Sequence, residues 1–173
     1  CAYEARQELA RLSETDGDPL RREIARNLYD GFDWVTRPTH LARWLECSRR
    51  FRKTGEYAKC AMRLLECILF AVASFPHGKL DPNIYSEEMR EEAREWIKKE
   101  LDRGEKDAFF RLNALRNCVA HGTRPYGQNA GDVQRALGDR AAMEKLLDDA
   151  LNLADTLLQE MARPQPEGGR VSR

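Results

Sequence analysis

The chain has 173 residues, and its 29 Lys and Arg residues balance its 29 Asp and Glu residues, so the formal net charge is zero. This length suits one domain with a hydrophobic core, and the neutral balance argues against a dedicated binder of duplex DNA, which is usually basic. The five cysteines are scattered and odd in number, which argues against a disulfide framework and favours reduced thiols in a cytoplasmic protein. No apolar run approaches the roughly 20 residues that span a bilayer, so we expect no membrane partner.

Helical signals are strong along the whole chain and strand signals are weak. We therefore predict an all-α fold, a bundle of about five to seven helices. In the first half, helices are expected over about the first dozen residues and over residues 19–30, 39–54 and 56–75. The second half of the last of these, residues 64–73, is apolar almost all round. Such a helix is buried inside a bundle rather than lying on its surface.

Two further helices are predicted in the middle of the chain. Ser86 is a suitable N-cap for a helix that Gly104 ends. The next helix spans Asp107 to His121, and Gly122 directly after it suits a left-handed C-terminal cap.

The remaining residues predict one long connection and one long helix. Residues 122–138 are rich in glycine and hold a short helix near residues 133–137, and the final helix covers residues 140–163. We expect residues 1–163 to form a single helical domain and residues 164–173 to be a disordered tail.

Six residues at the end of one predicted helix, Arg116-Asn117-Cys118-Val119-Ala120-His121, combine groups suited to phosphate chemistry. An arginine offers a planar, always charged fork for a phosphate, and a histidine gives or takes a proton near neutral pH. Asn117, directly after the arginine, can orient a phosphate oxygen or the imidazole. The candidate catalytic residues are therefore Arg116, His121 and Asn117.

The spacing of these residues constrains how a site can form. Arg116 and His121 are about 140° apart around a regular helix, whereas Asn117 and His121 share a face. A site built from all three lies where the chain leaves the helix, and a two-fold homodimer would complete it with a second copy. If the nucleophile is the ribose 2′-hydroxyl beside the phosphate, the reaction needs no metal or other cofactor and is restricted to RNA.

This segment resembles the R-x4-6-H motif of the HEPN superfamily, in which a polar residue also follows the arginine. The resemblance implies a helical bundle that dimerises and cleaves single-stranded RNA without a metal, leaving a 2′,3′-cyclic phosphate. It implies catalytic roles for Arg116 and His121 and a supporting role for Asn117.

Two other segments, Phe32-Asp33-Trp34 and Gly55-Glu56-Tyr57-Ala58, are similar to the HEPN half of CRISPR-associated ribonucleases that ring nucleotides activate. Those proteins carry an N-terminal sensor domain for cyclic oligoadenylate. Because the chain begins with Cys1 rather than Met, we interpret it as a piece of a longer protein, in which another domain senses an activator. The expected setting is prokaryotic antiviral defence.

Three more residues are candidates for contact with RNA. Arg124 and Tyr126 lie just past the motif, where they can grip or stack on a nucleotide, although both are also ordinary loop residues. Arg50 belongs to a basic helix face that either follows an RNA backbone or is simply solvated. That face consists of Arg43, Arg49, Arg50, Arg52 and Lys53.

The sequence also allows two other functions. One alternative is a non-catalytic dimerisation or nucleic-acid-binding module. In a dimerisation module Arg116 would be buried against a carboxylate, and His121 would cap the helix. A zinc-stabilised regulator would bind metal near Cys118 and His121, but structural zinc takes four ligands. We therefore predict no metal, and an apolar packing role for Cys118. Glu66, a lone carboxylate in an apolar helix, predicts an arginine partner, which is Arg63, a residue on another helix, or Arg116.

Overall fold

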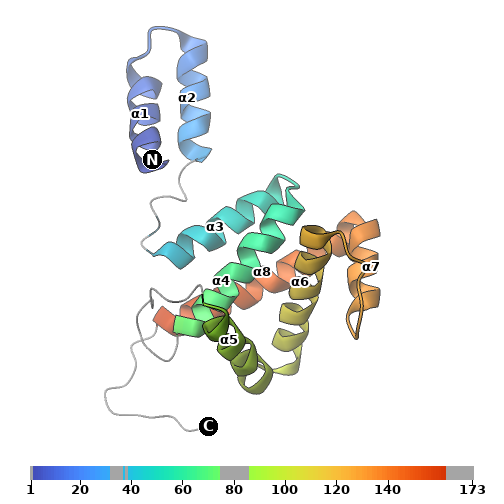
Figure 1. Ribbon diagram of the computed structural model, residues 1–173. Helices are drawn as coiled ribbons and strands as arrows, with labels where there is room; N and C mark the ends of the chain where they lie inside the picture. The colour runs from blue at the N-terminus through green and yellow to red at the C-terminus, as the bar shows by residue number, and fades with distance from the viewer. Residues whose placement is uncertain (1, 32–36, 38, 75–85, 163–173) are drawn as a thin grey trace, which may run out of the picture.

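A computed structural model describes residues 2–31, 37, 39–74 and 86–162. Within these ranges every regular element is an α-helix, which confirms the predicted all-α class. The described residues form eight helices, which are labelled in Figure 1: α1 (Ala2–Thr15), α2 (Pro19–Gly31), α3 (His40–Lys53), α4 (Tyr57–Ser74), α5 (Glu87–Glu100), α6 (Arg103–His121), α7 (Ala130–Gly138) and α8 (Arg140–Ala162).

The eight helices of the described residues exceed the predicted five to seven by one, and each segment that the sequence named as helical contains a helix, including α1 and the short α7. The predicted tail at residues 164–173 and the Phe32-Asp33-Trp34 segment lie outside the described residues.

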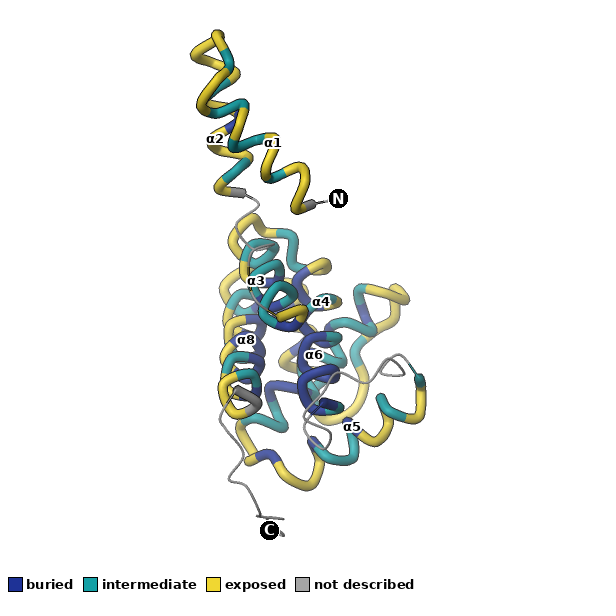
Figure 2. The backbone as a smooth tube through the Cα atoms, turned by 90° about the vertical axis from the view of Figure 1, so that its left-hand side faces the viewer, coloured by how far each residue is buried: buried dark blue, intermediate teal, exposed yellow. Residues whose placement is uncertain are grey.

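The centre of the fold is α4, which contacts α3, α5, α6 and α8. Eleven of its 18 residues are buried, as its apolar sequence predicts. Figure 2 shows the buried positions gathered where α4, α6 and α8 meet. Burying a large aliphatic or aromatic side chain stabilises a fold by about 1.5–3 kcal/mol, so the packing around α4 sets the positions of its neighbours.

The boundary between α5 and α6 lies earlier than the sequence predicts. The Asp102 carboxylate accepts a hydrogen bond from the Glu105 N–H at 2.8 Å, and the Glu105 carboxylate accepts one from the Asp102 N–H at 3.1 Å. This capping box satisfies two free backbone donors at once. The helix therefore begins at Arg103 rather than Asp107, and Gly104 lies inside α6 instead of ending α5.

The first two helices pack against each other as a hairpin, which Figure 1 shows apart from the other helices. Ala25 is buried between them, with 4% of its surface exposed. Leu20, Ile24 and Leu28 recur every four residues on one face of α2 and are 67%, 50% and 49% exposed. The contiguous hydrophobic core therefore begins with α3 and does not include this hairpin.

The cysteines of the described residues carry free thiols: Cys47, Cys60, Cys67 and Cys118. Cys60 and Cys67 are fully buried on α4. Burial raises the pKa of each of these two thiols to about 12, because an apolar environment disfavours the thiolate. The thiolate is the nucleophilic form, so both residues are expected to be chemically inert in the folded protein.

We expect Cys60 and Cys67 to resist iodoacetamide at pH 8 while the protein is folded, because pKa values of about 12 leave only a trace of thiolate. Peptide mass spectrometry after a timed reaction measures the modified fraction. In 6 M guanidinium chloride, used as the control, both should react readily. Modification of either residue at the same rate in folded and unfolded protein would contradict this expectation.

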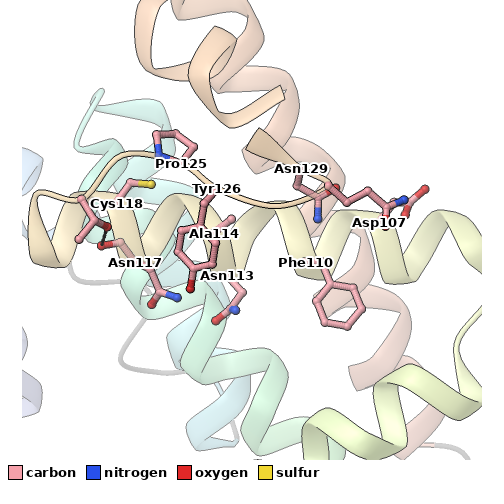
Figure 3. A pocket seen from close by; sticks show the side chains of 11 residues that line it. Asp107, Phe110, Asn113, Ala114, Asn117, Cys118, Pro125, Tyr126 and Asn129 are labelled. Carbon is pink, nitrogen blue, oxygen red and sulfur yellow. Dashed lines mark hydrogen bonds between the residues drawn. The ribbon is translucent and has the colours of Figure 1, made fainter. Parts of the chain in front are cut away.

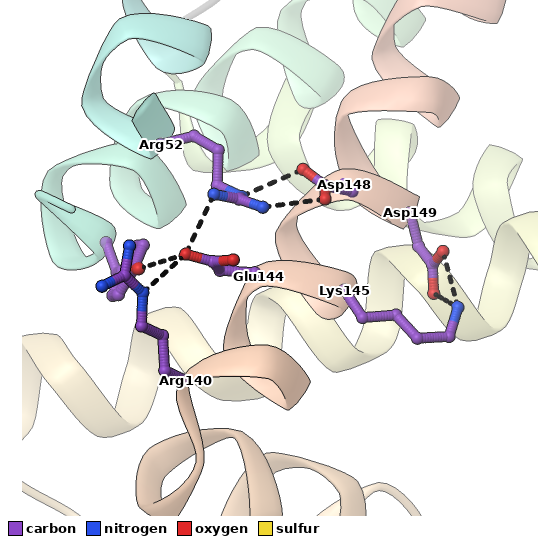
Figure 4. A network of polar contacts seen from close by, with 7 residues as sticks. Arg52, Arg140, Glu144, Lys145, Asp148 and Asp149 are labelled. Atoms are coloured by element: carbon purple, nitrogen blue, oxygen red, sulfur yellow. Dashed lines mark hydrogen bonds and ion pairs between the residues drawn. The ribbon is translucent and has the colours of Figure 1, made fainter. Parts of the chain in front are cut away.

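The basic face of α3 is partly turned towards α8. Arg52 donates to the two carboxylate oxygens of Asp148 at 3.0 and 2.9 Å and lies 3.3 Å from a Glu144 oxygen, as Figure 4 shows. Arg49 forms an ion pair with Asp155. These two arginines hold α3 against α8 and do not contribute to a free basic surface.

Glu144 receives three donors in this network. Besides Arg52, the Tyr57 hydroxyl donates to it at 2.7 Å and the Arg140 guanidinium at 2.9 Å. The hydrogen bonds from Tyr57 and Arg140 hold the pKa of Glu144 below its ordinary value. A carboxyl group whose pKa is lowered by folding stabilises the protein at neutral pH, and this contribution is lost as the pH falls through the lowered pKa.

Replacing Arg52 with alanine is expected to lower the free energy of unfolding at pH 7 by about 1 kcal/mol, because the lost pair is bidentate but partly exposed. Urea denaturation measures the change, which should shrink as the pH falls through the lowered pKa of Glu144. Arg21→Ala removes an arginine whose side chain is 75% exposed, and this control should cost less than about 0.5 kcal/mol. Equal losses in the two variants would show that Arg52 does not join the helices.

Candidate functional site

The motif occupies the last six residues of α6, whose position is fixed by its buried face. Phe109, Leu112 and Leu115 are completely buried, and Cys118 continues the same face with 7% of its surface exposed. Cys118 belongs to the hydrophobic core, as its predicted apolar role requires. The end of α6 is therefore held rigidly by packing, and the polar residues of the motif are left at the margin of the core.

Arg116 and Asn117 are joined through their side chains. Arg116 Nη1 donates to Asn117 Oδ1 at 3.1 Å, and both residues are half-buried. Among the described residues, Arg116 forms no ion pair with a carboxylate. A guanidinium has five N–H donors in a fixed fork, so one bond to a neutral amide leaves donors and charge available for an anion.

His121 is the last residue of α6 and is exposed. Its imidazole makes no hydrogen bond or ion pair with any residue that the structure describes, so it does not cap the helix there. Gly122 ends the helix instead, with φ 62° and ψ 23° in the left-handed region, as predicted. The structure thus joins Arg116 to Asn117, while His121 stays separate at the helix end.

After Gly122 the chain turns back along α6. The Thr123 hydroxyl donates to the Asn117 carbonyl at 3.4 Å, and Gly127 takes a second left-handed conformation, with φ 76°. The returning segment ends where α7 begins, at Ala130. Together with α6 it encloses a pocket of about 360 Å³, which Figure 3 shows from close by.

This pocket is a candidate functional feature that the sequence did not reveal. Its volume lies in the range of about 300–1,000 Å³ that is usual for small-molecule sites. Asn113 and Asn117 line it from α6 and Tyr126 lines it from the returning segment. Asn117 and Tyr126 are candidates from the sequence, whereas Asn113 is not. The available signal was the four-residue spacing of Asn113 and Asn117, which places both amides on one helix face.

The remaining RNA-contact candidates lie apart from the pocket lining. Arg124 is exposed and forms no bond with a described residue. Arg50 lies on α3, and its Nη2 donates to the Asp30 carbonyl of α2 at 3.0 Å. Contact of Arg124, Tyr126 or Arg50 with RNA stays a prediction.

Glu66 forms an ion pair with Arg90 of α5. Of the partners that the sequence left undecided for Glu66, the structure thus selects an arginine on another helix. Arg63, the alternative partner on the same helix, instead lies over the ring of Trp44, 5.0 Å from its centroid. Glu66 is therefore accounted for by a link between α4 and α5.

Within the described ranges, no three His, Cys, Asp or Glu side chains gather so that they could hold a metal ion. No helix described by the structure combines the length and apolar character needed to cross a membrane. Comparison of the chain with known protein families, curated proteins and solved structures finds no match. Function is therefore inferred from the chemistry of α6 and the segment that follows it.

Replacing Gly122 with alanine is expected to lower the free energy of unfolding by about 1–2 kcal/mol, because a residue with a Cβ pays that much in the left-handed conformation. No atom lies within 4 Å of the added Cβ, so the cost is conformational and not steric. Gly131→Ala, at an equally open position in α7, is the matched control and should raise stability by up to about 1 kcal/mol. Urea denaturation distinguishes the two, and changes of the same sign would contradict this account of the cap.

Proposed function

We propose that the protein is a metal-independent endoribonuclease that cuts single-stranded RNA through attack of a ribose 2′-hydroxyl on the neighbouring phosphate. The observation that carries this proposal is the state of Arg116. Its half-buried guanidinium sits at the end of a helix fixed by the core, and among described side chains it bonds only to a neutral amide. A bound phosphodiester would give this guanidinium the anionic partner that it does not have among the described residues.

Each residue of the motif then has a defined task. Arg116 binds the phosphate and stabilises the charge that grows on it in the transition state. Asn117 holds the guanidinium in place through the 3.1 Å hydrogen bond. His121 moves protons, and its exposure at the helix end leaves the imidazole accessible to a strand.

The reaction balances without any ion. A bond forms between the 2′-oxygen and phosphorus as the bond from phosphorus to the 5′-oxygen breaks. One proton leaves the 2′-hydroxyl and one is added to the 5′-oxygen, which yields a 2′,3′-cyclic phosphate and a free 5′-hydroxyl. Proton transfer of this kind typically contributes about 10²–10⁴-fold to the rate.

The proposal includes a two-fold homodimer. Arg116 and His121 are about 140° apart around the helix, so one chain presents an incomplete set of groups to a single phosphate. Two α6 ends that meet across a symmetry axis supply both arginines and both histidines to one site. By the resemblance to HEPN ribonucleases, we place this activity in CRISPR-type antiviral defence in the prokaryotic cytoplasm, under the control of an activator-sensing domain.

The competing function is a non-catalytic dimerisation or nucleic-acid-binding module. A dimerisation module would hold Arg116 against a carboxylate as a structural ion pair. Among the described residues Arg116 has no carboxylate partner, which argues against the dimerisation module. A nucleic-acid-binding module would leave Arg116 available for a phosphate in the same way, and the cleavage test below distinguishes that module from the enzyme.

Cleavage of a fluorescent single-stranded RNA in the presence of EDTA tests the proposal. The wild-type chain should cut the RNA and leave 2′,3′-cyclic phosphate ends, whereas His121→Ala and Arg116→Ala should slow cutting by about 100-fold or more. DNA and fully 2′-O-methylated RNA should remain intact, because neither has a free 2′-hydroxyl. Gel electrophoresis of the products measures the rates.

Two controls remove the same residue types elsewhere. His40→Ala on α3 and Arg21→Ala on α2 should cut at the wild-type rate, and circular dichroism and gel filtration should show unchanged helicity and oligomeric state in every variant. Equal cutting by all five proteins, or cutting that EDTA abolishes, would overturn the proposal.

A further inference from the structure

The pocket beside the motif has a lining that suits a nucleobase rather than a phosphate. No Lys, Arg or His lines it, and its one charged side chain is the carboxylate of Asp107, which repels anions. Carboxamides and aromatic rings supply much of the remaining wall: Asn113, Asn117, Gln128, Asn129, Phe110 and Tyr126.

Unpaired RNA bases match such a wall. A base is flat and neutral, with donors and acceptors along its edge, and proteins bind unpaired bases by stacking them on aromatic rings and hydrogen-bonding their edges. Tyr126 is 80% exposed at the pocket, so one face of its ring is available for stacking. Figure 3 shows this ring in the part of the pocket where Asn113 and Asn117 lie.

Asn113 is the side chain best placed to recognise the base. It is half-buried in the pocket wall, and its amide makes no hydrogen bond with a described residue. The Asn117 amide oxygen, by contrast, already accepts a hydrogen bond from Arg116. A free carboxamide presents a donor and an acceptor side by side, and these match the N7 acceptor and N6 amino group of adenine.

The bond between Arg116 and Asn117 connects this pocket to the phosphate site. The Asn117 side chain lines the pocket and also accepts the hydrogen bond from the Arg116 guanidinium. A strand whose phosphate lies on Arg116 therefore has the pocket next to it. We propose that the pocket binds an adenine of single-stranded RNA beside the phosphate that is cut, with Tyr126 stacked on the ring and Asn113 bonded to its edge.

This assignment rests on the proposed ribonuclease function and adds a base preference to it. Binding of fluorescein-labelled 8-mers to the His121→Ala chain, measured by anisotropy in EDTA, tests it without cleavage of the probe. The probes are an all-uridine strand and three strands in which one central uridine is replaced by A, C or G. The strand with A should bind at least about 5-fold more tightly than the other three, as expected for one added base contact.

Second substitutions in the same chain locate the contact. Asn113→Ala and Tyr126→Ala should each remove the preference for the A strand, whereas Tyr126→Phe, which keeps the ring, should retain that preference. Asn152→Ala on α8 and Tyr3→Ala on α1, both exposed, are the matched controls and should retain it. Thermal melts by circular dichroism verify that each variant is folded.

The outcomes separate this assignment from the proposed function. Equal affinity for all four strands, or a preference that survives both Asn113→Ala and Tyr126→Ala, overturns the adenine pocket even if the wild-type chain cuts RNA. A preference that depends on these residues, in a chain that never cuts RNA, upholds the pocket and overturns the ribonuclease. Failure to bind any strand overturns both.

Discussion

A helix that is apolar almost all round is stable in water only when other helices cover every side of it. The second half of α4 has this character, and α3, α5, α6 and α8 contact α4. This requirement fixes α6, whose buried face is turned towards the core and whose opposite face carries the amides of Asn113 and Asn117. The candidate site is therefore built on a helix whose position is set by core packing.

The parts of the fold that the sequence predicts are those encoded by neighbouring residues. The helical class, the burial of α4 and the left-handed Gly122 all follow from local patterns. The predicted start of α6 is wrong by four residues. Glycine is a common signal for the end of a helix, but the capping box of Asp102 and Glu105 begins α6 just before Gly104. The same local signals identify α2 as a helix but do not show that it pairs with α1 instead of joining the core.

The candidate site likewise has one part that the local sequence predicts and another that it does not. The bond between Arg116 and Asn117 is local and lies within the predicted motif. The pocket was not predictable because it forms only when the chain after Gly122 turns back on α6. The basic face of α3 is divided by partners far along the sequence, since Arg49 and Arg52 pair with Asp155 and Asp148 of α8, 106 and 96 residues away. No pattern within α3 alone distinguishes these two arginines from their neighbours.

Asn117 faces two ways at once, towards the guanidinium of Arg116 and into the pocket. Under the proposed function, a phosphate that moves the guanidinium would also move the Asn117 side chain in the pocket wall, and a base that moves Asn117 would alter its hydrogen bond to the guanidinium. Thermodynamic linkage makes such coupling equal in both directions. An RNA strand that occupies both sites would thereby be distinguished from a free nucleoside or a free phosphate, each of which would contact only one of the two coupled sites.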